Sequence, residues 1–73
     1  MKFERIQDLR DENFWTQKYV AHELNIAQRT YSHYESGTRS VPIGILICLA
    51  ELYNVSVDYL LGRTNNRKPY PKK

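Results

Sequence analysis

The chain has 73 residues and a formal net charge of +3, which is enough for one small domain. Its single cysteine, Cys48, excludes a disulfide framework and a cysteine-based metal site, and fits a reducing compartment such as the cytoplasm. The start of the chain lacks the apolar segment of a signal peptide, and the longest apolar run, 41–50, is too short to span a bilayer. We therefore expect a small cytoplasmic domain with no membrane partner.

The positive charge is concentrated at the C-terminal end. Residues 63–73 carry five basic side chains and no acid, whereas residues 1–62 carry six basic and eight acidic ones, a net charge of −2. Basic composition alone therefore does not indicate a nucleic-acid partner, which would have to rest on local clustering. Because 63–73 has two prolines and no periodicity, we expect a domain over 1–62 followed by a basic, disordered tail.

The spacing of apolar residues predicts a first helix over 2–13, with one apolar side formed by Phe3, Ile6 and Leu9. Arg10 lies at the edge of that side. An exposed arginine whose stem covers the core fits the pattern, and so does a partly buried ion pair with Glu35. The adjacent aromatic residues Phe14 and Trp15 interrupt the helix, and we expect them to cap the small core.

Two short helices, over 17–24 and 28–36, are expected to be joined by a tight turn. Thr16 precedes the first of them and can cap its N-terminus. Asn25 follows its last apolar position, and asparagine tolerates the left-handed conformation that ends a helix. Gly37 would end the second helix in the same way.

The helix over 28–36 has two unlike sides. Tyr31, Tyr34 and Glu35 face one way, and the opposite side is polar, with Arg29, Thr30, Ser32 and His33. Such a helix can lie in the major groove of DNA, although an ordinary solvated helical hairpin fits these residues equally well. Gln17 and Lys18 open the preceding helix, where free backbone N–H groups favour a phosphate.

A fourth helix over 42–53 is apolar on more than one side. Beside the stripe that faces the core, a second stripe is formed by Ile45, Cys48 and Leu52. Either this helix is buried on both sides or the second stripe meets another subunit, and we favour a dimer contact. A last short helix over 57–61 is expected, with Asn54 ending the helix before it and Ser56 as its cap.

No group of residues points to catalysis. His22 and His33 lie on different predicted helices at outward positions, and no pattern brings Cys48 near either of them. The three glycines are isolated, which excludes a phosphate-cradling loop, and the acids form no metal-binding loop. We therefore expect a protein that is not an enzyme, with no cofactor, no metal and no small-molecule ligand.

Many positions between residues 3 and 62 match one known pattern: Ile6, Leu9-Arg10, Thr16-Gln17, Ala21, Leu24, Ile26, Ser32, Tyr34-Glu35-Ser36-Gly37, Arg39, Pro42, Leu46, Ala50, Val55-Ser56 and Asp58-Tyr59-Leu60-Leu61-Gly62. On these positions the chain resembles the Cro/CI-type (XRE) helix-turn-helix family of phage-repressor-like DNA-binding domains. The resemblance implies a compact all-α fold of five helices, in which 17–24 and 28–36 form the helix-turn-helix. It also supports Arg10 and Glu35 as a structural ion pair.

The resemblance further implies a sequence-specific regulator of transcription, a repressor that binds double-stranded DNA as a homodimer on a two-fold symmetric operator. Together with the outward positions above, it predicts these DNA contacts: Gln17, Lys18, Gln28, Arg29, Thr30, Ser32, His33, Thr38 and Arg39. Ala27 departs from the family, which favours serine or threonine as the cap at this position. The alternative is a protein-interaction module with the same fold, such as an antitoxin or anti-regulator, which the charge of −2 over 1–62 favours.

Overall fold

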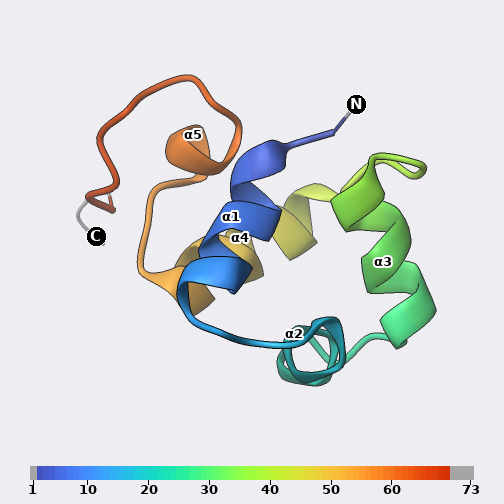
Figure 1. Ribbon diagram of the computed structural model, residues 1–73. Coiled ribbons are helices and arrows are strands. Elements are labelled where there is room, and N and C mark those ends of the chain that lie inside the picture. The colour runs from blue at the N-terminus through green and yellow to red at the C-terminus, as the bar shows by residue number, and fades with distance from the viewer. Residues whose placement is uncertain (1, 70–73) are drawn as a thin grey trace.

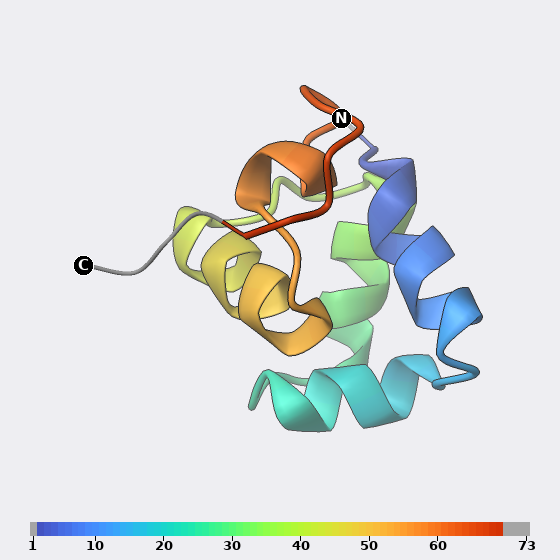
Figure 2. The same cartoon turned by 90° about the vertical axis from the view of Figure 1, so that its left-hand side faces the viewer.

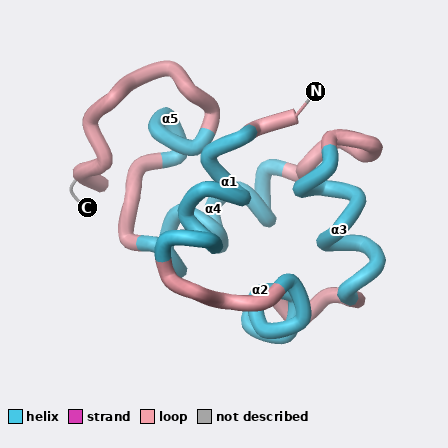
Figure 3. The backbone as a smooth tube through the Cα atoms, in the orientation of Figure 1, coloured by secondary structure: helices cyan, strands magenta, loops and turns pink. Residues whose placement is uncertain are grey.

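A computed structural model describes residues 2–69, which form five helices and no strand (Figures 1 and 3). The predicted all-α fold is confirmed, and the helix bounds differ from the predicted ones by two residues at most. The helices are α1 (Glu4–Glu12), α2 (Gln17–Glu23), α3 (Gln28–Ser36), α4 (Ile43–Tyr53) and α5 (Val57–Leu60). The first helix starts two residues later than predicted, because residue 3 is still extended.

Local cap chemistry sets where these short helices begin and end. The hydroxyl of Thr16 accepts a hydrogen bond from the backbone N–H of Tyr19, and that of Ser56 accepts one from Tyr59, both at 3.0 Å. Asn25 and Asn54 have φ angles of 58° and 55°, the left-handed conformation that reverses the chain after α2 and α4. The predicted caps and stops are therefore present.

The core lies between α1 and α4, with α2 and α3 on one side and α5 on the other (Figures 1 and 2). Every helix contributes to it, and its buried members are Ile6, Leu9, Val20, Ala21, Tyr31, Leu46, Leu49, Ala50, Val55, Tyr59 and Leu60. The largest fully buried side chain is Tyr31, from the inner side of α3. The rigid core therefore fixes the orientation of α3 and leaves its outer side free.

The exposed apolar side of α4 is not the one that the sequence predicts. Ile45 and Leu52 are half-buried and pack against the core, so two members of the predicted stripe are used within the chain. Cys48 is exposed, and with it Ile43 and Ile47, whose exposed fractions are 69% and 47%. The outward apolar side is therefore Ile43, Ile47 and Cys48, since small rotations of a helix that is apolar all round cannot be fixed by periodicity.

The prediction that Phe14 caps the core is wrong. Its backbone is left-handed, with a φ of 57°, and its side chain is 94% exposed. This turn reverses the chain after α1 and directs only Trp15 inward, where its ring stacks on Tyr53 at 5.5 Å and lies 5.0 Å from that of Tyr19. One residue of the aromatic pair therefore covers the core, and the other is directed into solvent.

The sequence predicts disorder after residue 62, but in the structure residues 63–69 lie against the rest of the chain. Residues 70–73 lie outside the described residues. Residues 63–69 run back along α5 on the side of the molecule away from α3 (Figures 1 and 2). The backbone N–H of Ser56 donates to the carbonyl of Arg67, and the Arg67 guanidinium binds both carboxylate oxygens of Glu12 at 3.0 and 2.8 Å. Composition could not reveal a pair between residues so far apart in the chain.

A second arginine fixes the same segment from α1. The Arg5 guanidinium donates to the backbone carbonyls of Tyr59 and Thr64, and to the side-chain oxygen of Asn65. The guanidinium groups of Arg5 and Arg67 both lie over the Tyr59 ring, at 4.1 and 5.2 Å from its centre. The segment 63–67 is thus attached to both α1 and α5.

Candidate nucleic-acid interface

Helix α3 carries most of the predicted contacts, and its two ends differ in kind. Ala27 has the extended backbone of a cap residue but no side chain that accepts a hydrogen bond, as the sequence indicates. Gly37 ends the helix with a φ of +82°. A side chain at this position would also collide with Lys2, because an added Cβ would lie 2.8 Å from the Lys2 Cβ. Glycine is therefore required here on two grounds.

The polar side of α3 and the start of α2 border one shallow hollow, whose volume is about 360 Å³. It is lined by Gln17, Gln28, Arg29, Ser32 and His33, which are five of the nine predicted contacts. Gln28 and Arg29 are exposed, whereas Ser32 and His33 are half-buried. The structure thus brings five of the predicted DNA contacts together on one surface.

The other four predicted residues do not line this hollow. Lys18 is exposed in the first turn of α2, and Thr30 is half-buried on the flank of α3. Thr38 and Arg39 are exposed in the loop after α3, where the Thr38 hydroxyl lies 2.9 Å from that of Ser36. The backbone N–H of Arg39 donates to the carbonyl of His33, which folds this loop back against the helix.

The predicted ion pair is present and is nearly removed from solvent. The Arg10 Nε and Nη2 donate to the two Glu35 carboxylate oxygens at 2.9 and 2.8 Å, and Nη1 donates to the Trp15 carbonyl at 2.9 Å. The exposed fractions of the two side chains are 14% and 4%. One guanidinium therefore joins α1, the loop before α2, and α3.

The charges in this pair stabilise each other. Burial opposes ionisation of Glu35, but its hydrogen bonds from Arg10 and Gln17 outweigh burial and hold the pKa of the carboxyl below its usual range. The hydrogen bond to Glu35 likewise raises the pKa of Arg10. Both groups are therefore charged at neutral pH.

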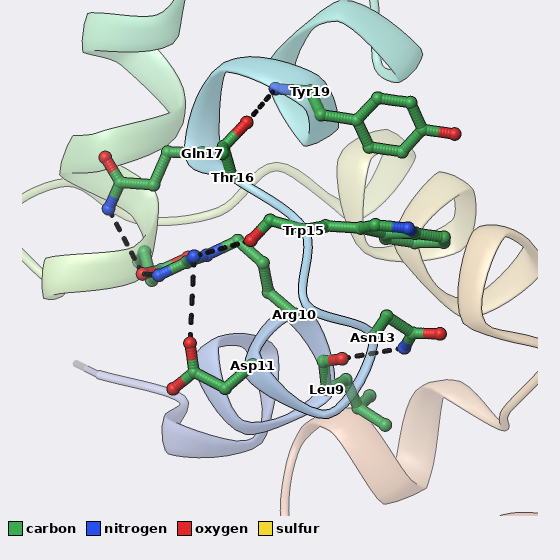
Figure 4. Close-up of polar contacts among 9 residues, drawn as sticks. Leu9, Arg10, Asp11, Asn13, Trp15, Thr16, Gln17 and Tyr19 are labelled. Carbon is green, nitrogen blue, oxygen red and sulfur yellow. Dashed lines mark hydrogen bonds and ion pairs between the residues drawn. The ribbon is translucent and has the colours of Figure 1, made fainter.

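Gln17 has a second contact that the sequence did not reveal. Its Nε2 donates to the Glu35 carboxylate at 3.1 Å, on the same oxygen that Arg10 Nη2 contacts (Figure 4). A residue at the edge of the polar hollow is thereby tied to the ion pair beneath it. Nothing in the local sequence indicates this contact, because it depends on how α2 lies against α3.

The basic side chains of the domain divide into two groups. Arg5 and Arg10 are held by hydrogen bonds within the chain. Within residues 2–62 of the described chain, the basic side chains without such a partner are Lys2, Lys18, Arg29 and Arg39. Three of these are predicted DNA contacts, and the fourth lies against Gly37. The free positive charge of the domain therefore gathers around α2, α3 and the loop that follows.

Two other kinds of site find no support in the part of the chain that the structure describes. No helix there is both long and apolar enough to cross a bilayer. No cluster of three histidine, cysteine or acidic side chains is arranged there to hold a metal ion.

Comparisons with known proteins identify the family of the chain. A family model described as helix-turn-helix matches residues 6–60. The chain is 38% identical over 72 residues to the HTH-type transcriptional regulator AnsR of Bacillus subtilis (strain 168), covering 99% of this chain and 62% of AnsR. It is also similar to YobD, an uncharacterized HTH-type transcriptional regulator of that organism, at 38% over 69 residues, covering 94% and 62%.

A third relative is more similar over a shorter stretch. The HTH-type transcriptional regulator ImmR of Bacillus subtilis (strain 168) is 42% identical over 59 residues, which covers 81% of this chain and 46% of ImmR. The chain thus spans about three fifths of AnsR and YobD and about half of ImmR.

Proposed function

Because the chain belongs to the Cro/CI-type (XRE) family of helix-turn-helix domains, we propose that it is a sequence-specific DNA-binding regulator of transcription. The observation that carries this proposal is the polar hollow over α2 and α3, together with the free cations of the domain, which lie on α2, on α3 and at the turn that follows α3. In the proposal α3 lies in the major groove of duplex DNA, where base edges are distinguishable. The protein acts in the cytoplasm as a repressor that occupies its operator.

Base reading is assigned to the exposed first turn of α3. Arg29 can donate two hydrogen bonds to a guanine, and Gln28 can pair with the edge of an adenine. Ser32 and His33, one turn further along the same side, supply shorter-range contacts, and Thr30 supports them from the flank of the helix. These assignments rest on residue chemistry and on shared position around the hollow.

Phosphate contacts are assigned to residues on either side of α3. Lys18 and Gln17 lie at the start of α2, and Thr38 and Arg39 lie beyond the end of α3. Contacts on both sides of a recognition helix fix its register in the groove without reading sequence. The hydrogen bond to Glu35 holds the Gln17 amide in one orientation, which favours a contact of defined geometry.

The protein is proposed to act as a homodimer on a two-fold symmetric operator, with half-sites about one helical turn apart. The exposed side of α4, Ile43, Ile47 and Cys48, is the candidate contact. Ile45 and Leu52, the other two members of the stripe predicted from the sequence, pack against the core instead. Apolar side chains that a monomer leaves in water favour such a contact.

Substitution of Arg29 tests base reading most directly. Arg29→Ala should relax the preference at one base pair of each half-site, at a cost of about 1–3 kcal/mol on the preferred sequence. Lys18→Ala is the matched control, because loss of a phosphate contact should weaken binding to every sequence alike. Equal weakening on all sequences by Arg29→Ala would make Arg29 a phosphate contact and contradict the assignment.

A gel shift at low salt separates this proposal from the protein-interaction alternative. The proposal requires that the wild-type chain retains random-sequence duplex DNA, since non-specific binding is electrostatic and strongest at low salt. Failure to retain any duplex, together with co-purification of a partner protein, would favour the interaction module.

A further inference from the structure

The second residue of the chain lies against the turn that ends α3. A Cβ added to Gly37 would be 2.8 Å from the Cβ of Lys2, 3.0 Å from its Cα and 3.1 Å from its backbone nitrogen. Figure 1 shows the N-terminal segment reaching the loop that follows α3. The N-terminal segment thus lies beside the turn that ends the helix-turn-helix.

Lys2 brings a charge to this surface that nothing within the described chain neutralises. Its side chain is exposed and has no hydrogen-bond or ion-pair partner there. The next exposed residues on the adjoining turn are Thr38 and Arg39, which are assigned above to phosphate contacts. A lysine ammonium on a flexible stem binds phosphate as a point charge and needs no fixed geometry.

We propose that Lys2 contacts the DNA backbone and extends the phosphate-binding surface of the Gly37–Arg39 turn. This inference rests on the proposed DNA-binding function. It adds a contact from a part of the sequence that precedes the first helix. It also explains why the free cations of a domain with net negative charge include this residue, which lies outside the helix-turn-helix.

The contact between Lys2 and Gly37 also has a purely structural interpretation, in which the backbone of residue 2 covers the turn and its charge has no role. Lys2→Ala distinguishes the two, because alanine keeps the nitrogen, Cα and Cβ atoms that approach Gly37. Lys2→Arg restores the charge. Lys68→Ala removes a lysine from the segment on the side away from α3, as a matched control.

The test measures dissociation constants for a selected and a random-sequence duplex between about 50 and 200 mM salt. Lys2→Ala should reduce the steepness of the plot of log affinity against log salt by about 0.9. The ratio of wild-type to variant affinity should therefore change by about 3.5-fold between the two ends of this salt range. The loss should be the same on both duplexes, because a phosphate contact carries no sequence information. Lys2→Arg should match the wild type, and Lys68→Ala should leave the slope unchanged.

Three results would overturn the inference. They are an unchanged slope in Lys2→Ala, an equal loss in Lys68→Ala, or a loss confined to the selected duplex. In each case the wild-type chain still binds DNA, so the proposed function stands. A wild-type chain that binds no duplex at low salt would instead remove the proposed function, and the role of Lys2 with it.

Discussion

Glu35 joins the two helices of the helix-turn-helix to α1. The residue is only 3% exposed, and its carboxylate accepts hydrogen bonds from Arg10 on α1 and from Gln17 on α2. A buried charge with this many donors is stable only while all of them are present. The pair therefore fixes three helices relative to one another, and the proposed DNA-binding surface depends on it.

Glu35→Gln should lower the free energy of unfolding at pH 7 by about 3 kcal/mol, because it leaves the Arg10 charge partly buried without a counter-charge. The measurement is urea denaturation. The double variant Arg10→Met with Glu35→Leu is the matched control and should lose less, since both charges leave together. A double variant that loses as much as the single one would show that packing, and not charge pairing, sets the cost.

The same pair predicts a pH dependence. The pKa of Glu35 is lowered in the folded state from its ordinary value near 4.5, so the unfolded chain takes up a proton first as the pH falls. The stabilisation from Glu35 is thus complete above pH 4.5 and is lost as the pH falls through the lower folded-state pKa. The difference in stability between the wild type and Glu35→Gln should narrow below pH 4.5, and a constant difference would contradict this account.

The N-terminal caps of α2 and α3 differ, because a side chain caps α2 and none caps α3. Ala27→Ser should stabilise the domain by about 1 kcal/mol, because residue 27 already has the extended backbone of a cap residue and lacks only the accepting oxygen. Thr16→Ala should destabilise it by a similar amount, since it removes the bond to Tyr19. Urea midpoints compare both variants, and an Ala27→Ser midpoint at or below the wild type would show that the start of α3 is already satisfied.

At the scale of the helix, sequence reasoning succeeded where the determinants are local. Thr16, Asn25, Gly37, Asn54 and Ser56 act on neighbouring backbone groups, so their roles could be predicted from residue type and order. The polar side of α3 was predictable for the same reason.

It failed where the outcome depends on distant parts of the chain. The exposure of Phe14 follows from a turn. The outward side of α4 follows from packing against the core, and the shape of the core cannot be predicted from the spacing of apolar residues. The contacts of Gln17 with Glu35 and of Arg67 with Glu12 join distant segments. The DNA contacts themselves could be proposed from the sequence, but the position of Lys2 beside Gly37 could not.

Helix α4 carries the prediction on assembly. Ile47→Glu should convert a dimer to a monomer while the fold is kept, because the side chain is 47% exposed in the single chain. Sedimentation equilibrium measures the mass, and circular dichroism checks the helices. Phe14→Glu is the control, since it places the same charge on another exposed apolar residue away from α4. A wild-type chain that is monomeric at all concentrations would exclude the proposed dimer.

For the molecule as a whole, the structure separates the basic C-terminal segment from the proposed DNA-binding surface. Arg67 binds Glu12, and the Arg63 Nε lies 3.9 Å from the Asp58 Oδ1. The segment runs along the side opposite α3 (Figure 2). The sequence had left open whether this charge adds to DNA binding. In the folded chain the described part of the segment contacts α1 and α5.

Deletion of residues 63–73 should therefore leave the salt dependence of DNA binding unchanged and lower the Tm. The expected loss of stability follows from the hydrogen bonds that Arg67 and Asn66 make to Ser56 and Glu12. Fluorescence anisotropy across salt concentrations and thermal melts measure the two effects. A salt slope that falls by several units on deletion would place the segment on the DNA.

Selection of bound duplexes from a random DNA pool tests the central claim, that α3 reads sequence, most directly. The account predicts enrichment of one motif, with two related half-sites about one helical turn apart. The same selection with Arg29→Ala should lose its preference at one position of each half-site. A pool that shows no enriched sequence after repeated rounds, although the wild-type chain is folded, would contradict the account.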